Sequence, residues 1–194
     1  MQLASATYAL SPTGDGDKRC FTETNQCIQG RFLARWEASG GLAINGYPLS
    51  GEFKQQLEDN KEYTVQYFER VRLEYHPENQ PPQDIQLGQF GRRIVQTVTG
   101  APTAAVSPRE GGVHFRETGH NVAPDFFAFW GANGGLAQFG YPLTEEFTQT
   151  LEDGKSYTVQ YFERARFERH PENQPPSTIL LGQFGRRILA ETRR

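Results

Sequence analysis

The sequence predicts an α+β protein that contains two tandem copies of a small repeat unit, a helix plus a β-hairpin. The main observation is a self-match: residues 20–95 align with residues 114–189 without a gap, and 48 of the 76 aligned positions are identical. A match of that quality at a fixed spacing indicates two copies of one structural unit. An aromatic helical stripe and a strand-like alternation also recur at equivalent places in both copies.

The repeat divides the chain into five segments. They are an irregular leader at 1–19, the first unit at 20–95, a Pro/Thr/Ala-rich linker at 96–113, the second unit at 114–189 and a tail at 190–194. The prolines of the linker favour an extended course. A unit of this size buries only about 60 % of its unfolded surface. We therefore expect either an unusually good core in each unit or packing of one unit against the other.

Each unit opens with an aromatic helix. Its stripe has the spacing i, i+1, i+4, which places three rings or branched chains on one face; the residues are Phe32, Leu33 and Trp36, then Phe126, Phe127 and Trp130. Paired glycines at 40–41 and 134–135 end these helices in the manner of a left-handed cap. We expect both tryptophans in the core, packed against Phe53 and Phe147.

A Gly-Tyr-Pro-Leu turn follows at residues 46–49 and 140–143. The next segment is predicted to be a short helix, because Ser50 can cap its first amides and Phe53 and Leu57 have i, i+4 spacing. The second unit has Thr144 as the capping residue. The dipeptides at 59–60 and 153–154 then predict a turn that leads into a strand.

Residues 63–76 alternate apolar and polar side chains with a period of two, which is typical of a β-strand. Glu69 and Phe68 break the alternation, since one uninterrupted strand would bury the carboxylate. A hairpin turn around Glu69-Arg70 removes the conflict, because crossing a turn can reset which face points inward. The proline-rich segment at 77–82 must then be a loop. A last short strand at Ile85 and Leu87 and a terminal turn or short helix around Gly88 and Gly91, with Phe90 and Ile94, complete the unit.

Composition limits the class of partner. The formal net charge of −3 argues against a nucleic-acid-binding protein, which would normally be basic. No apolar run approaches the roughly 20 residues that cross a bilayer, so we expect no membrane insertion. Cys20 and Cys27 are predicted to form a local disulfide, which indicates an oxidising, extracellular compartment. A zinc site with His114 or His120 and a reduced, unpaired state are the alternatives.

Two Glu-x-His-x-Glu motifs are candidates for metal binding or acid–base chemistry; they comprise Glu74, His76 and Glu78, then Glu168, His170 and Glu172. Alternate strand residues point the same way. A proline interrupts each motif, however, and no third ligand from elsewhere is evident. We therefore expect no metal site and no cofactor, and we interpret these side chains as hydrogen-bonding groups that hold the proline loop.

Aromatic and basic side chains are the remaining candidates for ligand contacts. Tyr47 and Tyr141 follow glycine in turns, whereas both tryptophans have the spacing of core residues. With the histidines and arginines near the proline loop, the predicted ligand-binding set is Tyr47, Tyr141, His76, His170, Arg72 and Arg166. The Arg-Arg pairs at 92–93 and 186–187 are either an anion site or a solvated helix end. No catalytic motif occurs, so no catalytic residue is predicted.

The repeat resembles LGFP repeats of secreted bacterial proteins and a related extracellular repeat. The motifs are Glu-Thr-Gly-His at 117–120, Gly-Tyr-Pro at 140–142, Val-Gln-Tyr-Phe-Glu-Arg at 159–164 and Leu-Gly-x-x-Gly at 181–185. The resemblance covers both copies and implies a non-catalytic accessory or cell-envelope module of a larger secreted protein or assembly. The first copy departs from it, with Asn25-Gln26 in place of Gly-His.

The expected function is a non-catalytic extracellular module for binding or display. By family analogy, its first candidate ligand is a carbohydrate or cell-envelope polymer, and two equal copies suit bivalent binding. One alternative is a metal-dependent hydrolase that uses the Glu/His/Glu set. The other is a structural spacer whose copies only stack, which predicts a continuous core between them.

Overall fold

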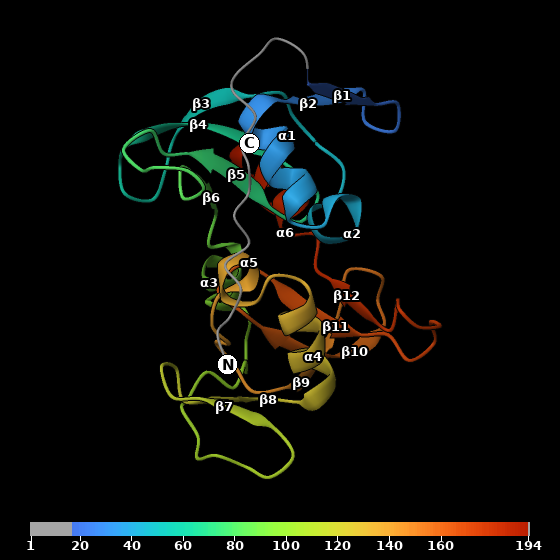
Figure 1. Cartoon of the computed structure of the whole chain (residues 1–194). Coiled ribbons are helices and arrows are strands. Elements are labelled where there is room, and N and C mark those ends of the chain that lie inside the picture. Colours follow the sequence, from blue (N-terminus) through green and yellow to red (C-terminus); the bar gives the residue numbers. More distant parts are fainter. Residues whose placement is uncertain (1–16, 194) are drawn as a thin grey trace.

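A computed structural model describes residues 17–193 of the chain (Figure 1). Within this range the strands form two four-stranded and two two-stranded sheets, and all strand pairs are antiparallel. Helices and strands alternate without a parallel βαβ crossover, so the fold is α+β, as predicted. Most of the predicted leader, residues 1–16, lies outside the described residues.

The first unit contains nine elements. In chain order they are β1 (Lys18–Phe21), β2 (Gln26–Gln29), α1 (Gly30–Ala38), α2 (Gly41–Asn45), β3 (Phe53–Gln56), β4 (Glu62–Tyr67), β5 (Arg72–Tyr75), β6 (Ile85–Leu87) and α3 (Phe90–Val95). The main sheet has the order β3-β4-β5-β6, and β1 and β2 form a separate hairpin.

The second unit has the same elements in the same order. They are β7 (Val113–Phe115), β8 (His120–Val122), α4 (Pro124–Ala132), α5 (Gly135–Phe139), β9 (Phe147–Thr150), β10 (Ser156–Tyr161), β11 (Arg166–Arg169), β12 (Ile179–Leu181) and α6 (Phe184–Thr192). Six of them, from α4 to β12, reproduce the bounds of their counterparts at an offset of 94 residues. Helix α6 runs into the predicted tail, and no helix or strand occurs between α3 and β7.

The aromatic helices form as predicted, but their tryptophans differ. Trp36 is 2 % exposed, and its Nε1 donates to the carbonyl oxygen of Gly46 at 3.0 Å. Trp130 makes the equivalent hydrogen bond but is only partly buried. The predicted partner Phe53 is wrong: Trp36 packs edge-on against Phe21, with ring centroids 5.6 Å apart. Phe53 is 38 % exposed and stacks on Tyr67 instead.

The short helix predicted after the Gly-Tyr-Pro-Leu turn is also wrong, because this segment is strand β3. The Asp59-Asn60 turn returns the chain antiparallel, and β3 finds backbone partners along β4, from Gln56↔Glu62 to Phe53↔Val65. Pairing with a ready strand edge outweighs the local helical spacing. Ser50 therefore caps no helix; its hydroxyl accepts the backbone N–H of Tyr67 at 3.1 Å.

The hairpin predicted around Glu69-Arg70 is confirmed. Strand β4 ends at Tyr67, β5 begins at Arg72, and their register pairs those two residues. Phe68 is completely buried at the start of the turn. Glu69 lies within the turn and accepts the backbone N–H of Tyr47 at 3.3 Å. The carboxylate thus stabilises the neighbouring turn instead of entering the core.

The terminal helices of the two units lie between the two main sheets. Helices α3 and α6 contact each other, α3 also contacts β10, and α6 also contacts β4. In Figure 1, the red helix α6 lies among the elements of the first unit, and the green helix α3 lies beside the second. The shared core contains Leu57, Tyr63, Val65, Tyr67, Phe90, Ile94, Val95, Tyr157, Val159, Tyr161, Phe184, Ile188 and Leu189. Each unit therefore completes its core with the helix of the other.

Glycine makes this reciprocal packing sterically possible. A Cβ at Gly91 would lie 1.8 Å from the carbonyl oxygen of Phe162, and a Cβ at Gly185 would lie 1.9 Å from that of Phe68. Both distances are far below van der Waals contact, so only glycine fits at either position. The Leu-Gly-x-x-Gly sequence is thus a contact motif between the units.

A second contact between the units joins α2 to α5. Ile44 belongs to the hydrophobic core of the second unit. Beside it, Gln138 Nε2 donates to Asn45 Oδ1 at 3.1 Å, and both amides are buried. The two units differ at these positions, since Gln138 and Phe139 replace Ile44 and Asn45. This interface therefore uses unlike residues from the two copies.

Candidate functional site

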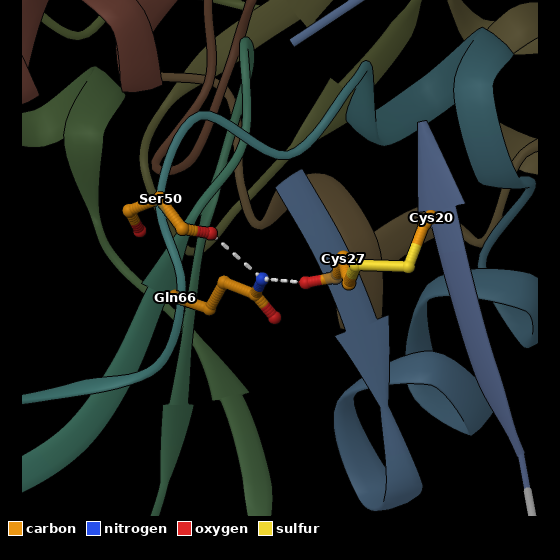
Figure 2. The surroundings of a disulfide bond; sticks show 4 residues. All are labelled: Cys20, Cys27, Ser50 and Gln66. Carbon is orange, nitrogen blue, oxygen red and sulfur yellow. Dashed lines mark hydrogen bonds between the residues drawn. A yellow bond between two sulfur atoms is a disulfide. The ribbon is translucent and has the colours of Figure 1, made fainter. Parts of the chain in front are cut away.

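The predicted disulfide between Cys20 and Cys27 is present (Figure 2). The two cysteines face each other in the β1–β2 hairpin, with Cα atoms 4.0 Å apart. No other cysteine occurs in the sequence. The zinc alternative for these two residues is therefore wrong, because their sulfur atoms bond to each other. A disulfide in so short a hairpin is compatible with an oxidising compartment.

The second unit joins the same two strand positions without a disulfide. His114 and Asn121 face each other across β7 and β8, and His114 Nδ1 lies 3.2 Å from Asn121 Oδ1. A polar cross-strand contact thus takes the place of the covalent bond. This pair and the cysteine pair hold equivalent hairpins in the two units.

A buried glutamine ties each small hairpin to its main sheet. Gln66 Nε2 donates to the carbonyl oxygens of Cys27 and Ser50, both at 2.8 Å (Figure 2). Gln160 Nε2 donates to Asn121 and Thr144 in the same way. In each unit, the side-chain amide of this buried glutamine thus donates to one carbonyl of the hairpin and one carbonyl next to the main sheet. These hydrogen bonds connect the hairpin to the sheet specifically.

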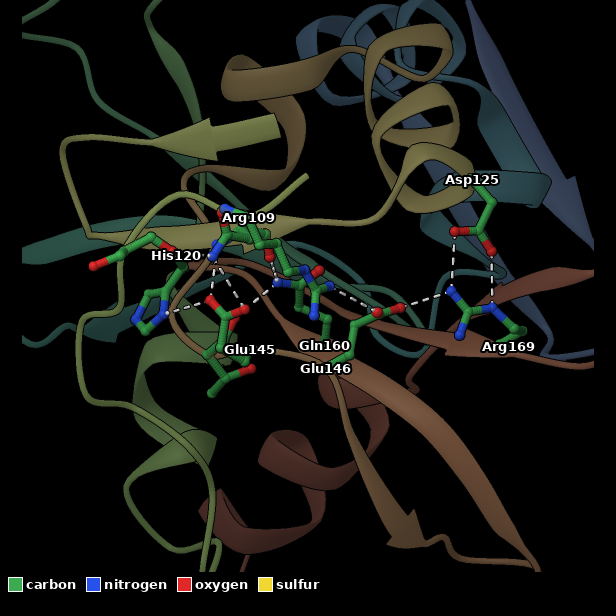
Figure 3. Close-up of polar contacts among 10 residues, drawn as sticks. Arg109, His120, Asp125, Glu145, Glu146, Gln160 and Arg169 are labelled. Carbon is green, nitrogen blue, oxygen red and sulfur yellow. Dashed lines mark hydrogen bonds and ion pairs between the residues drawn. The ribbon is translucent and has the colours of Figure 1, made fainter. Parts of the chain in front are cut away.

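The second unit adds a polar network that the first unit lacks (Figure 3). Glu145 accepts the backbone N–H of Asn121 at 2.7 Å and lies 3.3 Å from His120 Nδ1. Next to it, Glu146 accepts from Arg109 and Arg169 at 3.2 and 2.6 Å. These contacts tie the end of the linker and the β7–β8 hairpin to the main sheet.

His120 and Glu145 are both held by the surrounding structure. The side chain of His120 is almost fully buried, and its carboxylate partner Glu145 is already bound to the backbone. We interpret His120 and Glu145 as a structural contact of the second unit.

Sequence reasoning missed this network, although a signal was present in the differences between the copies. Arg169 binds Asp125 through two hydrogen bonds of 2.8 and 2.9 Å. The first copy has Tyr75 and Arg31 at these positions, and the guanidinium of Arg31 lies 5.5 Å from the centre of the Tyr75 ring. Both members of the pair changed together, which is typical of residues in contact.

The two Glu-x-His-x-Glu motifs form continuous polar arrays. His76 lies between two carboxylates, 3.2 Å from Glu74 Oε2 and 3.0 Å from Glu78 Oε1. Its backbone N–H donates to the carbonyl oxygen of Asp84 across the proline loop. His170 has the equivalent contacts with Glu168 and Glu172 at 3.3 and 2.9 Å. Both arrays therefore hold the proline loop through hydrogen bonds, which agrees with the interpretation from the sequence.

Arg72 continues the array inward. It donates to Glu74 and Glu58, both at 2.8 Å, and its guanidinium lies 5.2 Å from the centre of the Phe90 ring. Burial disfavours the charged guanidinium, but the contacts with Glu74, Tyr67 and Glu58 together outweigh burial, so the pKa of Arg72 is raised. Arg166 has the same surroundings in the second unit. Loss of either partner from a buried pair of this kind would leave an uncompensated charge, and the arginine is not accessible to a ligand.

The Arg-Arg pairs at the terminal helices are also paired with carboxylates. Arg92 forms an ion pair with Glu163, and Arg186 forms one with Glu69 at 2.6 Å. Arg93 and Arg187 both pair with Glu191. The first two pairs cross between the units, so these arginines reinforce the interface instead of forming a free anion site.

Four aromatic rings of the second unit gather beside the β7–β8 hairpin and remain partly exposed; we call them the aromatic platform: Phe115, Phe127, Trp130 and Tyr141. The ring of Phe115 lies edge-on, 5.4 Å from that of Trp130 and 6.1 Å from that of Tyr141. Phe127 stacks on Trp130 at 5.7 Å. Within residues 17–193, the Tyr141 hydroxyl makes no hydrogen bond to the protein. The platform thus presents aromatic faces with an available polar group.

The predicted ligand residues do not form one site. Tyr47 packs against Phe21 and Tyr141 against Phe115, on the small hairpins. His76 instead packs against Tyr63 beside the proline loop, with ring centroids 4.0 Å apart. Because the histidines and arginines of the predicted set are buried and paired, only the tyrosines remain candidates for ligand contacts.

A shallow depression of about 390 Å³ lies elsewhere on the second unit, between the β9–β10 turn and the proline loop. Its polar lining is largely committed to the protein. Arg169 pairs with Asp125 and Glu146, and the Tyr157 hydroxyl donates to Asp153 at 2.8 Å. It offers few groups that would orient a ligand, so the aromatic platform is the stronger candidate site.

No protein-family description matches the chain, and neither the curated proteins nor the solved structures contain a significant match. Within residues 17–193, no three His, Cys, Asp or Glu side chains converge as a group that would hold a metal ion. None of the helices in that range has the length and apolar content of a transmembrane segment.

Proposed function

We propose that the protein is a non-catalytic extracellular binding module whose ligand is a carbohydrate or carbohydrate-containing cell-envelope polymer. The aromatic platform carries this proposal. A pyranose ring has a C–H face that packs on an aromatic ring, and its hydroxyl groups need donors and acceptors at the rim. Partly exposed rings around a few polar groups are typical of such ligand sites.

The rim of the platform supplies polar groups of both kinds. The Tyr141 hydroxyl can donate and accept, and Arg116 and Glu117 are exposed in the turn that follows Phe115. In the first unit, the equivalent glutamate Glu23 accepts from the Tyr47 hydroxyl at 3.1 Å, so a carboxylate from this turn reaches the tyrosine. The extracellular assignment is supported by the Cys20–Cys27 disulfide.

A ligand-free structural spacer is the second candidate. The observation that favours it is the core shared by the two units, with α3 and α6 between the main sheets. Such packing is what a purely stacking repeat requires. It does not compete with the platform for residues, however, because none of the four platform residues belongs to the shared core. The two candidates therefore make different predictions for binding.

Titration with a panel of soluble oligosaccharides, including chitotetraose, cellotetraose and mannotetraose, tests the proposal through the fluorescence of Trp130. We expect a saturable change with at least one of them. Tyr141→Ala should abolish the change, whereas the matched variant Tyr47→Ala should retain it. The protein should not hydrolyse the bound sugar, with or without added zinc. Absence of binding to the panel and to intact cell-wall material would favour the structural spacer.

A further inference from the structure

The first unit contains the counterpart of the aromatic platform, but the structure encloses it. The equivalent residues are Phe21, Leu33, Trp36 and Tyr47. Phe21, Leu33 and Trp36 are 8, 6 and 2 % exposed, whereas all four platform residues of the second unit are partly exposed. Nearly the same rings thus lie in the same fold with different access to solvent.

Arg19 lies over the rings of the first unit. Its guanidinium carbon is 5.4 Å from the centre of the Phe21 ring and 5.3 Å from that of Trp36. Glu37, on the adjacent turn of α1, pairs with Arg19 at 3.7 Å. A guanidinium at this distance from two rings makes cation–π contacts with them. It takes up ring surface on which a sugar would otherwise stack.

The second unit lacks both members of this pair. Its counterparts of Arg19 and Glu37 are Val113 and Gly131. Val113 is exposed, and nothing lies within 4 Å of the position where a Cβ would stand on Gly131. No cation therefore covers the platform from either position.

The tyrosine hydroxyls of the two sites also differ: that of the first unit is hydrogen-bonded within the protein. In the first unit the Tyr47 hydroxyl donates to Glu23, and this hydrogen bond raises the pKa of Tyr47. Tyr141 and Glu117 are the equivalent residues, but within the described chain no hydrogen bond joins them. Among the described residues, a ligand of the second unit would therefore displace no protein partner from the Tyr141 hydroxyl.

We propose that the protein binds one saccharide per chain, at the second unit alone, and that Arg19 closes the equivalent surface of the first unit. This inference rests on the proposed function and replaces the bivalent binding that two equal copies suggested. Arg116 and Glu117, the exposed charges in the turn that follows Phe115, are of opposite sign. The chemistry that suits them is a neutral saccharide, recognised through hydroxyl groups and a C–H face.

Acrylamide quenching tests the asymmetry without any ligand, because the chain contains only two tryptophans, one in each unit. Trp36→Phe leaves Trp130 as the reporter, and Trp130→Phe leaves Trp36. We expect several-fold stronger quenching of Trp130 than of Trp36. If either variant fails to fold, the wild-type chain should still give a two-component quenching curve. Equal quenching of the two tryptophans would overturn the inference.

Exchanging the closing residues between the units tests their role. Arg19→Val, made in the Trp130→Phe background, should increase the quenching of Trp36. The reciprocal double variant Val113→Arg with Gly131→Glu, made in the Trp36→Phe background, should decrease the quenching of Trp130. Lys18→Val is the matched control, because it removes an exposed cation from the same strand. A Trp36 signal unaffected by Arg19→Val would contradict the assignment of Arg19.

Calorimetric titration with the oligosaccharide that binds tightest completes the test. The wild-type chain should bind one molecule, Arg19→Val two, and the double variant at Val113 and Gly131 none. Two equal sites in the wild-type chain would overturn the inference while leaving the proposed function intact. Unequal quenching without saccharide binding would overturn the proposed function and the stated ligand, but not the closure of the first unit by Arg19.

Discussion

The backbone N–H of Arg92 donates to the carbonyl oxygen of Glu163 at 3.0 Å, and their side chains form an ion pair across 71 residues of sequence. In the equivalent contact, the second unit is the donor: the backbone N–H of Arg186 donates to the carbonyl oxygen of Glu69 in the first unit at 3.1 Å. Each terminal helix is therefore hydrogen-bonded to the hairpin turn of the other unit. This reciprocal arrangement is that of a symmetric dimer, here contained in one chain.

Loss of glycine at this contact should destabilise the whole protein. In Gly91→Ala and Gly185→Ala the new methyl group meets a backbone carbonyl oxygen, so the helix must move away from its turn. We expect a loss of about 1–3 kcal/mol for each substitution, the usual cost of overpacking. Chemical denaturation measures it. Gly131→Ala is the control and should be neutral or stabilising, because space is open there and the residue is helical; an equal loss in all three would contradict the close approach.

The two tryptophans should differ in their contribution to stability. Trp36→Ala empties a buried site and removes a hydrogen bond to Gly46, so we expect a loss of about 3–5 kcal/mol. Trp130→Ala removes a partly exposed ring and should cost clearly less. Urea denaturation of the two variants gives the comparison. A larger loss for Trp130→Ala would place that ring in the core and remove it from the platform.

The disulfide should stabilise the first hairpin without being required for folding. The second unit holds the same positions with His114 and Asn121, so the hairpin has a non-covalent alternative. Removal of the bond by Cys20→Ser with Cys27→Ser should cost about 2 kcal/mol, the size expected for a short closed loop. The grafted pair Cys20→His with Cys27→Asn should recover part of the loss. Mass spectrometry after alkylation of the native protein should detect no free thiol; two would contradict the bond.

Acid should destabilise the protein through the carboxylates that face the buried arginines. Burial opposes ionisation of Glu58 and Glu152, but the hydrogen bonds and positive charges of Arg72 and Arg166, with backbone hydrogen bonds, together outweigh burial and lower the pKa of both from 4.5. A lowered folded-state pKa contributes stability that is present above 4.5 and is lost as the pH falls through the lower value. Thermal melting points should therefore drop below about pH 4. Glu58→Gln with Glu152→Gln should lower the melting point at neutral pH and flatten this dependence; an unchanged acid profile would contradict the assignment.

Two tyrosines should resist alkaline titration. Hydrogen bonds to Asp59 and Asp153 raise the pKa of Tyr63 and Tyr157 to about 12. The neutral phenol is favoured in the fold, so its contribution to stability is present below pH 10 and is lost as the pH rises through about 12. Tyrosinate absorbance should show a late component in the native protein. Asp59→Asn and Asp153→Asn should each move part of it to lower pH, and a single uniform titration would contradict these hydrogen bonds.

The sequence by itself determined the local structure where the pattern was unambiguous. The glycine pairs, the aromatic stripe and the conflict at Glu69 predicted the helix ends and the hairpin because backbone conformation and side-chain periodicity are properties of neighbouring residues. The closeness in sequence of Cys20 and Cys27 predicted the disulfide. Sequence reasoning was wrong for β3, since the strand depends on a partner edge that local spacing does not describe.

Only the tertiary structure decided against which unit each terminal helix packs. It also decided which tyrosine hydroxyl is hydrogen-bonded within the protein. Two copies with the same motif predict the same interior, and no local pattern states that Gly91 packs on Phe162 instead of on its own hairpin. Likewise, the two Gly-Tyr-Pro turns are identical in sequence, but the Tyr47 hydroxyl donates a hydrogen bond to Glu23. The Tyr141 hydroxyl makes no hydrogen bond within the described residues. Such differences arise from contacts between distant residues, for example the cation–π contacts of Arg19 with Phe21 and Trp36, which its counterpart Val113 cannot make.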